Sequence, residues 1–320
     1  FGLCLYIVAS LLCVFAQDEW SLIAARILQA LGGCVGVVMA RAAIRDRLDM
    51  HSAAQAFASM MIVTAIAPIL APSLGAWVLM FYEWNVIFLV LMGCGLLSLA
   101  CVHFLFKETL EPERRLKLNV QQVLSLYRSI FQDQSFRHPL YAGCFSSAVM
   151  FCYISASSAI LMDRYQLTEQ QFAYAFGANA VGIMLFSTLN KRLAGRFSIL
   201  QRLKIGIVLQ LVGVFVLVLL GYLDVDSIAL VLLGMFVVVA SIGFTGPNAM
   251  ALAMAKQGAR AGTASAIMGS MQFVCGLLGG LLLNFLVWNA LLNMALIMLV
   301  FVCIAVWAIC QLELPVFKHE

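Results

Sequence analysis

The chain has 320 residues, of which 64% are hydrophobic and 11% are charged, and its mean hydropathy is +1.02. A soluble protein needs a wetted exterior, so this composition excludes a soluble globular domain and indicates a membrane protein with several spans. The net charge of +4 comes from short basic clusters between apolar runs, which does not fit a nucleic-acid-binding surface.

Apolar runs follow one another along the whole chain. Most reach the roughly 17–25 residues that a spanning helix requires, whereas barrel strands are about ten residues long and alternate in polarity. We therefore expect an all-α membrane protein with ten spanning helices, at about residues 1–16, 21–44, 53–80, 84–106, 139–162, 172–189, 205–223, 227–252, 262–286 and 288–311.

The charges between these runs alternate in sign. The turn at 17–20 is acidic and the connection at 41–52 is basic. In the same way, the basic stretch 191–204 precedes an acidic turn at 224–226. Cytoplasmic loops concentrate Lys and Arg, so the basic connections are expected to face the cytoplasm. Both termini are then cytoplasmic.

A polar segment at 107–138 divides the chain. Its second part has apolar residues on one helical face, at Val120, Val123, Leu124, Tyr127, Ile130 and Phe131. This spacing predicts a short amphipathic helix on the membrane surface. We expect an incomplete N-terminal bundle of four helices at 1–106, a cytoplasmic linker at 107–138 and a six-helix bundle at 139–320.

Arg26 is the one charged residue that lies clearly inside an apolar run. Helical spacing places Arg26 and Gln29 on one face together with small residues. An Arg near the bilayer centre costs about 2.5–3.5 kcal/mol on the insertion scale. Two interpretations stay open. Arg26 and Gln29 face an aqueous cavity, where they bind a ligand or couple to a carboxylate, or Arg26 snorkels to the outer headgroups or pairs with Glu19.

Two prolines stand four residues apart in the run at 53–80. Pro68 and Pro72 remove backbone hydrogen bonds on one face, so the helix should bend there. Gly75 follows them and permits close approach of another helix. The bend serves either packing or gating.

Several polar residues interrupt the later apolar runs. Each of them either lines a cavity or forms an interhelical hydrogen bond. They are Tyr153, Ser155, Asn179, Gln210, Asn248 and Gln272.

The ten cysteines lie within apolar runs without a Cys-x-x-Cys pair, and the four histidines show no ligand spacing, so we expect no metal site. Thr168 and Gln171 have the spacing of a capping box at a helix start.

The chain resembles the major facilitator superfamily, and within it the Bcr/CflA group of drug–proton antiporters. Ala30, Ala71 and Ala76 replace glycines of the family patterns. The similar segments, in order, are Leu22-x3-Arg26-x2-Gln29-Ala30-x-Gly32-Gly33, Arg45-Asp46, residues 67–77, 83–88 and 107–110, Phe172-x-Tyr174-x-Phe176-x2-Asn179 and residues 261–265.

This resemblance implies a transporter of two six-helix halves, so two further helices are expected before residue 1 and the chain is interpreted as N-terminally truncated. The family places a proton-binding acid in the first helix, and no Asp or Glu lies mid-membrane in these 320 residues. Among the isolated polar residues, the resemblance favours Tyr153, Asn179 and Gln272 as cavity-facing.

The loop at 190–197 resembles the second-half copy of a cytoplasmic loop motif of the family. This implies a latch on the cytoplasmic side. The alternative is ordinary positive-inside charge. The predicted latch residues are Arg45, Asp46, Lys191, Arg192 and Arg196.

No ATP-binding loop Gly-x4-Gly-Lys-Ser/Thr and no nucleophile–base constellation occurs in the sequence, so we expect a secondary transporter rather than an enzyme. The resemblance implies a monomeric exporter of small lipophilic drugs, driven by a proton gradient without a cofactor, in the inner membrane of a bacterium. The alternatives are transport of a polar metabolite on the same fold, and a membrane protein without transport activity.

Overall fold

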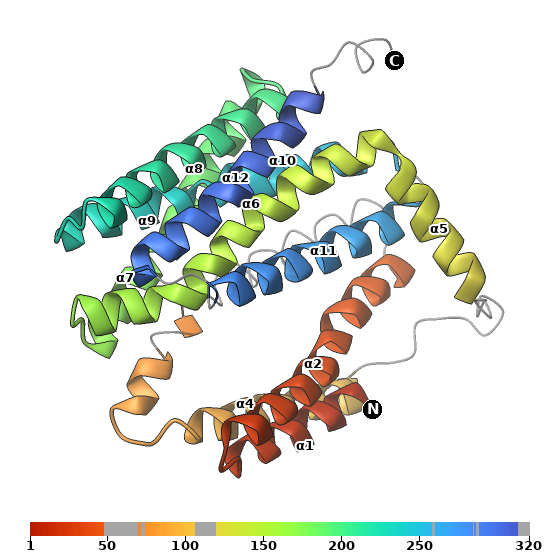
Figure 1. Ribbon diagram of the computed structural model, residues 1–320. Coiled ribbons are helices and arrows are strands. Elements are labelled where there is room, and N and C mark those ends of the chain that lie inside the picture. The colour runs from red at the N-terminus through yellow and green to blue at the C-terminus, as the bar shows by residue number, and fades with distance from the viewer. Residues whose placement is uncertain are drawn as a thin grey trace. The chain divides into compact units, whose positions relative to one another are not determined.

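The computed structural model describes residues 1–47, 70–71, 74–105, 120–257, 260–283, 285 and 288–312. The chain divides into two compact units, Phe1–Lys117 (unit 1) and Leu118–Glu320 (unit 2), and the division falls inside the predicted linker. Each unit is an assembly of helices, as Figure 1 shows. The described part of the chain contains no β-strand, in agreement with the predicted all-α class.

Unit 1 contains three described helices, α1 (Gly2–Val14), α2 (Glu19–Arg47) and α4 (Val86–Leu105). Helix α1 contacts both of the others. A Cβ atom added to Gly32 of α2 would lie 2.5 Å from the backbone nitrogen of Tyr6, so only glycine permits this approach of α2 to α1. Likewise, a Cβ atom at Gly95 of α4 would lie 2.9 Å from the Tyr6 ring. Tyr6 is therefore held between two glycines on different helices.

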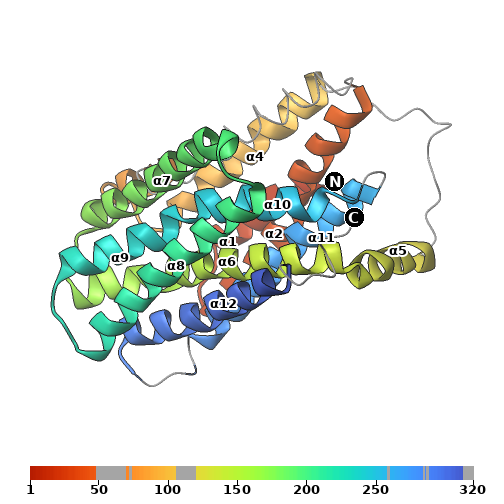
Figure 2. The same ribbon diagram turned by 90° about the horizontal axis from the view of Figure 1, so that it is seen from above.

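Unit 2 is built around α6 (Gln134–Ser158), which continues as the π-helical segment η2 (Ala159–Arg164). Helix α6 contacts α10, α11 and α12, and most of its residues are buried. Figure 2 shows these helices from above. The other elements of the unit are α5 (Val120–Gln132), α7 (Glu169–Arg192), η3 (Leu193–Gly195), α8 (Ile199–Tyr222), α9 (Ile228–Ala240), α10 (Ile242–Met254), α11 (Ala261–Leu282) and α12 (Ala290–Leu312).

Seven segments among the described residues are long and apolar enough to cross a membrane. They agree with the last seven predicted runs, and the predicted total of ten is not confirmed. Helix α1 has 13 residues and is shorter than a span, α2 is not one of the seven, and most of the run at 53–80 lies outside the described residues. The seven are Val86–Leu105, Gln134–Arg164, Glu169–Gly195, Ile199–Tyr222, Ile228–Met254, Gly262–Leu282 and Ala290–Leu312.

Capping side chains fix where several helices begin. The predicted capping box at Thr168 and Gln171 is confirmed, and it starts α7 at Glu169. A second box, formed by Ser198 and Gln201, starts α8 at Ile199, six residues before the apolar run predicted its beginning. Asp133 caps α6 in a similar way by accepting a hydrogen bond from the backbone of Ser135. Capping explains these early starts because polar first turns carry no hydropathy signal.

The amphipathic helix predicted in the linker is present as α5. Its residue Ile130 is fully buried and its residues Leu126 and Phe131 pack against the core of unit 2, whereas Leu124 and Tyr127 are exposed. The helix therefore packs on the rest of unit 2 and still leaves exposed apolar side chains of the kind that suit a membrane interface.

Candidate functional site

A chain of hydrogen bonds in unit 1 starts at Arg26. The guanidinium Nη1 donates to Oε1 of Gln29, and Nε2 of Gln29 donates to the hydroxyl of Ser10 at 2.7 Å. The Ser10 hydroxyl donates in turn to the carbonyl oxygen of Tyr6, also at 2.7 Å. Gln29 and Ser10 are buried, while Arg26 is exposed. Buried amides and hydroxyls thus hold an accessible cation in one position.

The other contact of Arg26 is aromatic. Its guanidinium carbon lies 5.6 Å from the ring centroid of Phe88 on α4, within the range of a cation–π interaction. No carboxylate among the described residues is paired with Arg26, and Glu19 is not one of its partners. The positive charge is therefore oriented by an amide and a ring, which do not neutralise it.

The glycines on the face of Arg26 differ in how closely neighbouring atoms approach them. Gly32 is a close-packing position against α1, as described above, whereas a Cβ atom at Gly36 would meet nothing within 4 Å. The same holds for Gly75, the glycine beside the predicted bend. Pro68 and Pro72 lie outside the described residues, and of the gating positions only Gly75 is described.

In unit 2, Tyr153 and Asn179 form a buried pair. The Asn179 side-chain nitrogen donates to the Tyr153 hydroxyl at 2.8 Å and joins α7 to α6. The Tyr153 ring also stacks on Phe176, with centroids 5.5 Å apart. The two predicted cavity residues are thus partners of each other. Gln272 on α11 is half-buried and makes no hydrogen bond to this pair.

A second polar cluster joins three helices near the middle of unit 2. The Ser146 hydroxyl of α6 donates to the Thr245 hydroxyl of α10 at 2.6 Å. The amide of Gln210 on α8 donates to the Ser146 carbonyl oxygen at 3.2 Å. All three side chains are buried. For Gln210 the structure therefore shows an interhelical hydrogen bond, the second of the two interpretations that its sequence left open.

Asn190, in the last turn of α7, is the centre of a third cluster. Its amide nitrogen donates to the Gly243 carbonyl oxygen at 3.3 Å, and its Oδ1 accepts from Asn248 at 2.9 Å and from Arg202 at 3.0 Å. Arg202 also donates to the Asn190 carbonyl oxygen at 3.2 Å. This cluster ties α7 to α8 and α10.

The predicted latch residues of this region stand apart from that cluster. Lys191, Arg192 and Arg196 are exposed, and the side chains of Arg45 and Asp46 lie outside the described set. Sequence reasoning selected the exposed cations of the loop and missed Asn190 and Arg202. The sequence feature that could have indicated this cluster is Asn190 at the end of α7, followed by Arg202 at the start of α8.

A fourth cluster surrounds Asp133, where α5 meets α6. Its carboxylate accepts from the Ser135 hydroxyl at 2.7 Å and from the amide of Gln257, beyond α10, at 2.9 Å. Partial burial by itself would raise the pKa of Asp133, but these hydrogen bonds and the charge of Arg260 outweigh it and lower the pKa overall. Asp133 is therefore held as an anion.

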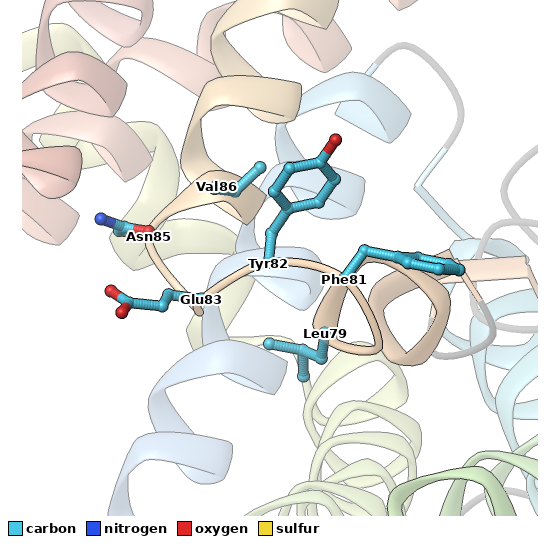
Figure 3. A pocket seen from close by; sticks show the side chains of 6 residues that line it. All are labelled: Leu79, Phe81, Tyr82, Glu83, Asn85 and Val86. Carbon is cyan, nitrogen blue, oxygen red and sulfur yellow. The ribbon is translucent and has the colours of Figure 1, made fainter.

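Unit 1 has a hollow of about 530 Å³ at the turn before α4. In Figure 3, Glu83 and Asn85 extend to one side of this turn and Phe81 to the other. None of its lining residues is a predicted site residue. They are Leu79, Phe81, Tyr82, Glu83, Asn85 and Val86. As for metals, the described residues contain no group of three or more His, Cys, Asp or Glu side chains that could hold an ion.

The spans and buried polar clusters define a multi-pass helical membrane protein with an oriented cation in one unit. A sequence profile described as Major Facilitator Superfamily matches residues 1–280. An uncharacterized MFS-type transporter of Bacillus subtilis, YdgK, is 30% identical over 274 residues, which make up 85% of this chain and 68% of that protein. The chain therefore belongs to the major facilitator superfamily, a family of membrane transporters rather than enzymes.

Two further relatives carry names from drug resistance. A bicyclomycin resistance protein homolog of Haemophilus influenzae is 28% identical over 264 residues, covering 80% of this chain and 64% of that protein. Multidrug resistance protein MdtL of Citrobacter koseri is 26% identical over 281 residues, covering 86% and 68%. The chain thus spans about two thirds of the length of these curated relatives.

Two solved transporter structures have a fold similar to that of this chain. The crystal structure of a bacterial homolog to the human lysosomal transporter Spinster, inward-facing and unoccupied, matches with a TM-score of 0.63 at 14% identity, over 97% of this chain and 80% of that one. Its occupied form matches with a TM-score of 0.67, over 97% and 79%. At this identity the likeness concerns the fold alone.

Proposed function

We propose that this protein exports small lipophilic molecules in exchange for protons, by alternating access between two helical halves. The support comes from the family and from the names of its relatives, which include bicyclomycin resistance and multidrug resistance proteins. It acts as a monomer in the inner membrane of a bacterium, with both termini in the cytoplasm and the basic connections on that side.

The observation that carries the proposal is the orientation of Arg26. A cation inside an apolar segment is expensive unless it reaches water, and here it is exposed on the surface of unit 1. Gln29 and Ser10 hold it in place, and no described carboxylate neutralises it. An oriented positive charge can attract an electronegative group of a substrate or sense a carboxylate that gains and loses a proton.

For unit 2 we propose complementary roles. Gln272, half-buried on α11, contacts the substrate with its amide, while Asn179 fixes the position of the buried Tyr153 ring between α6 and α7. Pro68, Pro72 and Gly75 form the bend that gates the path. On the cytoplasmic side, Lys191, Arg192 and Arg196 with Arg45 and Asp46 latch the closed state.

The test is transport by the purified full-length protein in proteoliposomes. With an inward-directed proton gradient, we expect bicyclomycin or ethidium to cause proton flux, reported by a pH-sensitive dye inside the vesicles. Arg26→Ala should abolish this flux and Arg26→Lys should restore part of it. Arg128→Gln, which changes an exposed cation on α5, is the matched control and should leave it unchanged.

Three other outcomes would each contradict a different part of the proposal. Absence of proton flux with every drug would overturn antiport. Uptake of a polar metabolite down its own gradient would favour the alternative transporter on the same fold. Equal flux in Arg26→Ala and in the unaltered chain would instead remove Arg26 from the mechanism and favour snorkelling.

A further inference from the structure

The charged residues of the connection between α7 and α8 are all positive. Residues 190–204 contain five cations and no acidic residue. Two of the cations end α7, one directly follows the short η3 turn, and two lie in the first two turns of α8. Because η3 contacts α8, these parts are close in space. The cations are Lys191, Arg192, Arg196, Arg202 and Lys204.

Arg202 is held inside this cluster without being neutralised. Its Nη1 donates to both oxygens of Asn190, at 3.2 and 3.0 Å, and both acceptors are uncharged. Its Nε is covered and has no hydrogen-bond acceptor. Asn190 is itself fixed by Asn248, which donates to the same Oδ1 at 2.9 Å. The guanidinium is therefore half-buried, oriented and without a carboxylate partner among the described residues.

A half-buried cation of this kind requires an anion from elsewhere, since an uncompensated buried charge is strongly destabilising. Both hydrogen bonds to Asn190 come from Nη1, so Nη2 of Arg202 takes part in neither of them. A guanidinium N–H of this kind donates a strong, charge-assisted hydrogen bond to an oxygen of a phosphate or carboxylate. Lys191 and Arg196 are exposed on the same connection and can add positive charge around such an anion.

The surroundings indicate where the anion comes from. On the membrane side of the cluster, α7 exposes Leu185 and Leu189, and α8 exposes Val208 and Val212. Arg202 lies four residues beyond the cap Ser198, about 6 Å along the helix axis, which is the depth of a headgroup rather than of the bilayer centre. A charged group continuous with exposed aliphatic side chains matches a phospholipid, whose headgroup is followed by acyl chains.

We propose that the α7–α8 connection binds the phosphate of an anionic phospholipid from the inner leaflet. Arg202 provides the fixed guanidinium, and Lys191 and Arg196 close around the headgroup. Asn190 is a positioning residue that holds Arg202. Binding compensates the charge of Arg202 and joins the ends of α7 and α8 at the membrane surface. This site does not depend on which molecule the protein transports.

The experiment is native mass spectrometry of the purified full chain titrated with phosphatidylglycerol and, separately, with phosphatidylcholine. We expect retention of one phosphatidylglycerol in preference to phosphatidylcholine. Because a cation near an anionic surface contributes about 1 kcal/mol, each of Lys191→Gln and Arg196→Gln should weaken this binding about fivefold. Arg128→Gln, an exposed cation on α5, is the control and should leave it unchanged.

Arg202→Lys gives a second readout. It keeps the charge and a donor toward Asn190 but removes the second terminal nitrogen of the guanidinium, so phosphatidylglycerol should bind more weakly while the helical content by circular dichroism is unchanged. Equal retention of the two lipids would overturn the proposal, as would equal effects of Arg196→Gln and Arg128→Gln. If inorganic phosphate raises the melting temperature as much as phosphatidylglycerol does, the anion is free phosphate and the lipid assignment is wrong.

Discussion

The amide of Gln29 donates a 2.7 Å hydrogen bond to the hydroxyl of Ser10, and its carbonyl oxygen accepts from Arg26. The buried side chain of Gln29 thereby connects α1 to Arg26, a cation inside an apolar run. Gln29 can orient Arg26 because its hydrogen bond to Ser10 of α1 fixes the Gln29 side chain independently of the guanidinium.

Replacing Gln29 by Leu tests this relationship. The variant keeps the bulk of the side chain but removes both hydrogen bonds, so Arg26 loses its fixed direction. Hydrogen bonds to charged groups contribute about 1.5–3 kcal/mol, and we expect drug-dependent proton flux to fall about ten- to a hundredfold. Gln17→Leu, at an exposed position before α2, should have no effect. Unchanged flux in Gln29→Leu would show that Arg26 needs no orientation.

The Tyr153–Asn179 pair makes a prediction about stability. Tyr153→Phe keeps the ring on Phe176 but leaves the Asn179 amide without its 2.8 Å acceptor. Interhelical hydrogen bonds in membranes contribute about 0.6 kcal/mol on average and up to about 1.7, so thermal unfolding in detergent should show a loss in that range.

Two comparisons isolate the hydrogen bond. Tyr174→Phe removes a hydroxyl from an exposed ring on α7 and should not change the unfolding free energy. Tyr153→Phe introduced into Asn179→Leu should cost almost nothing, because the partner is already absent. Additive losses in the double variant would mean that the two side chains act independently.

Gly32 and Gly36 offer a matched pair on one helix. Gly32→Ala would place a Cβ atom 2.5 Å from the Tyr6 nitrogen and 2.7 Å from the Gly2 carbonyl oxygen, so α1 must move. Overpacking of this kind costs about 1–3 kcal/mol. Gly36→Ala meets nothing within 4 Å and should be neutral or slightly stabilising. Trp fluorescence during thermal unfolding measures both, and equal behaviour would contradict the close packing of α1 on α2.

Hydropathy predicted the spans because run length alone decides whether a helix can cross a bilayer. The runs at 84–106 and 205–223 accordingly appear as α4 and α8, and the capping box at Ser198 shifts the start of α8. Capping at Thr168 was predictable as well, since both of its partners lie within one turn of the chain.

Partners that are distant in the sequence could not be predicted in this way. The hydrogen bonds between Gln29 and Ser10 and between Asn248 and Asn190 join residues on different helices. Whether such residues meet depends on how far each helix is rotated about its axis, and composition does not determine that rotation. For this reason the sequence indicated Arg26 and Gln29 as neighbours on one face but not Ser10, and it selected Lys191 rather than Asn190.

Asn190 provides a fourth prediction. Asn190→Ala removes the acceptor of Arg202 and of Asn248 and the donor to the Gly243 carbonyl oxygen. The Asn248 amide still donates to the Phe244 carbonyl oxygen, and Arg202 still donates to the backbone carbonyl oxygen of residue 190. The variant therefore loses individual hydrogen bonds of about 0.5–1.5 kcal/mol each, and the melting temperature in detergent should fall. Thr188→Ala, an exposed residue two positions earlier whose hydroxyl bonds only to its own helix, should change it little. A similar loss in both variants would assign the effect to the end of α7 and not to the cluster.

Asp133 predicts how stability depends on pH. Because the pKa of its carboxyl is lowered in the folded protein, the folded state favours the anion more than the unfolded state does. The stabilisation is therefore complete above the unfolded pKa of about 3.9 and is lost as the pH falls through the lower folded value. Asp133→Asn keeps a capping side chain for α6 but removes the charge near Arg260. The melting temperature of the unaltered chain should exceed that of this variant at pH 7, and the gap should shrink below about pH 4. A gap that stays constant from pH 7 to pH 3 would mean that the hydrogen bonds from Ser135 and Gln257 do not depend on the charge of Asp133.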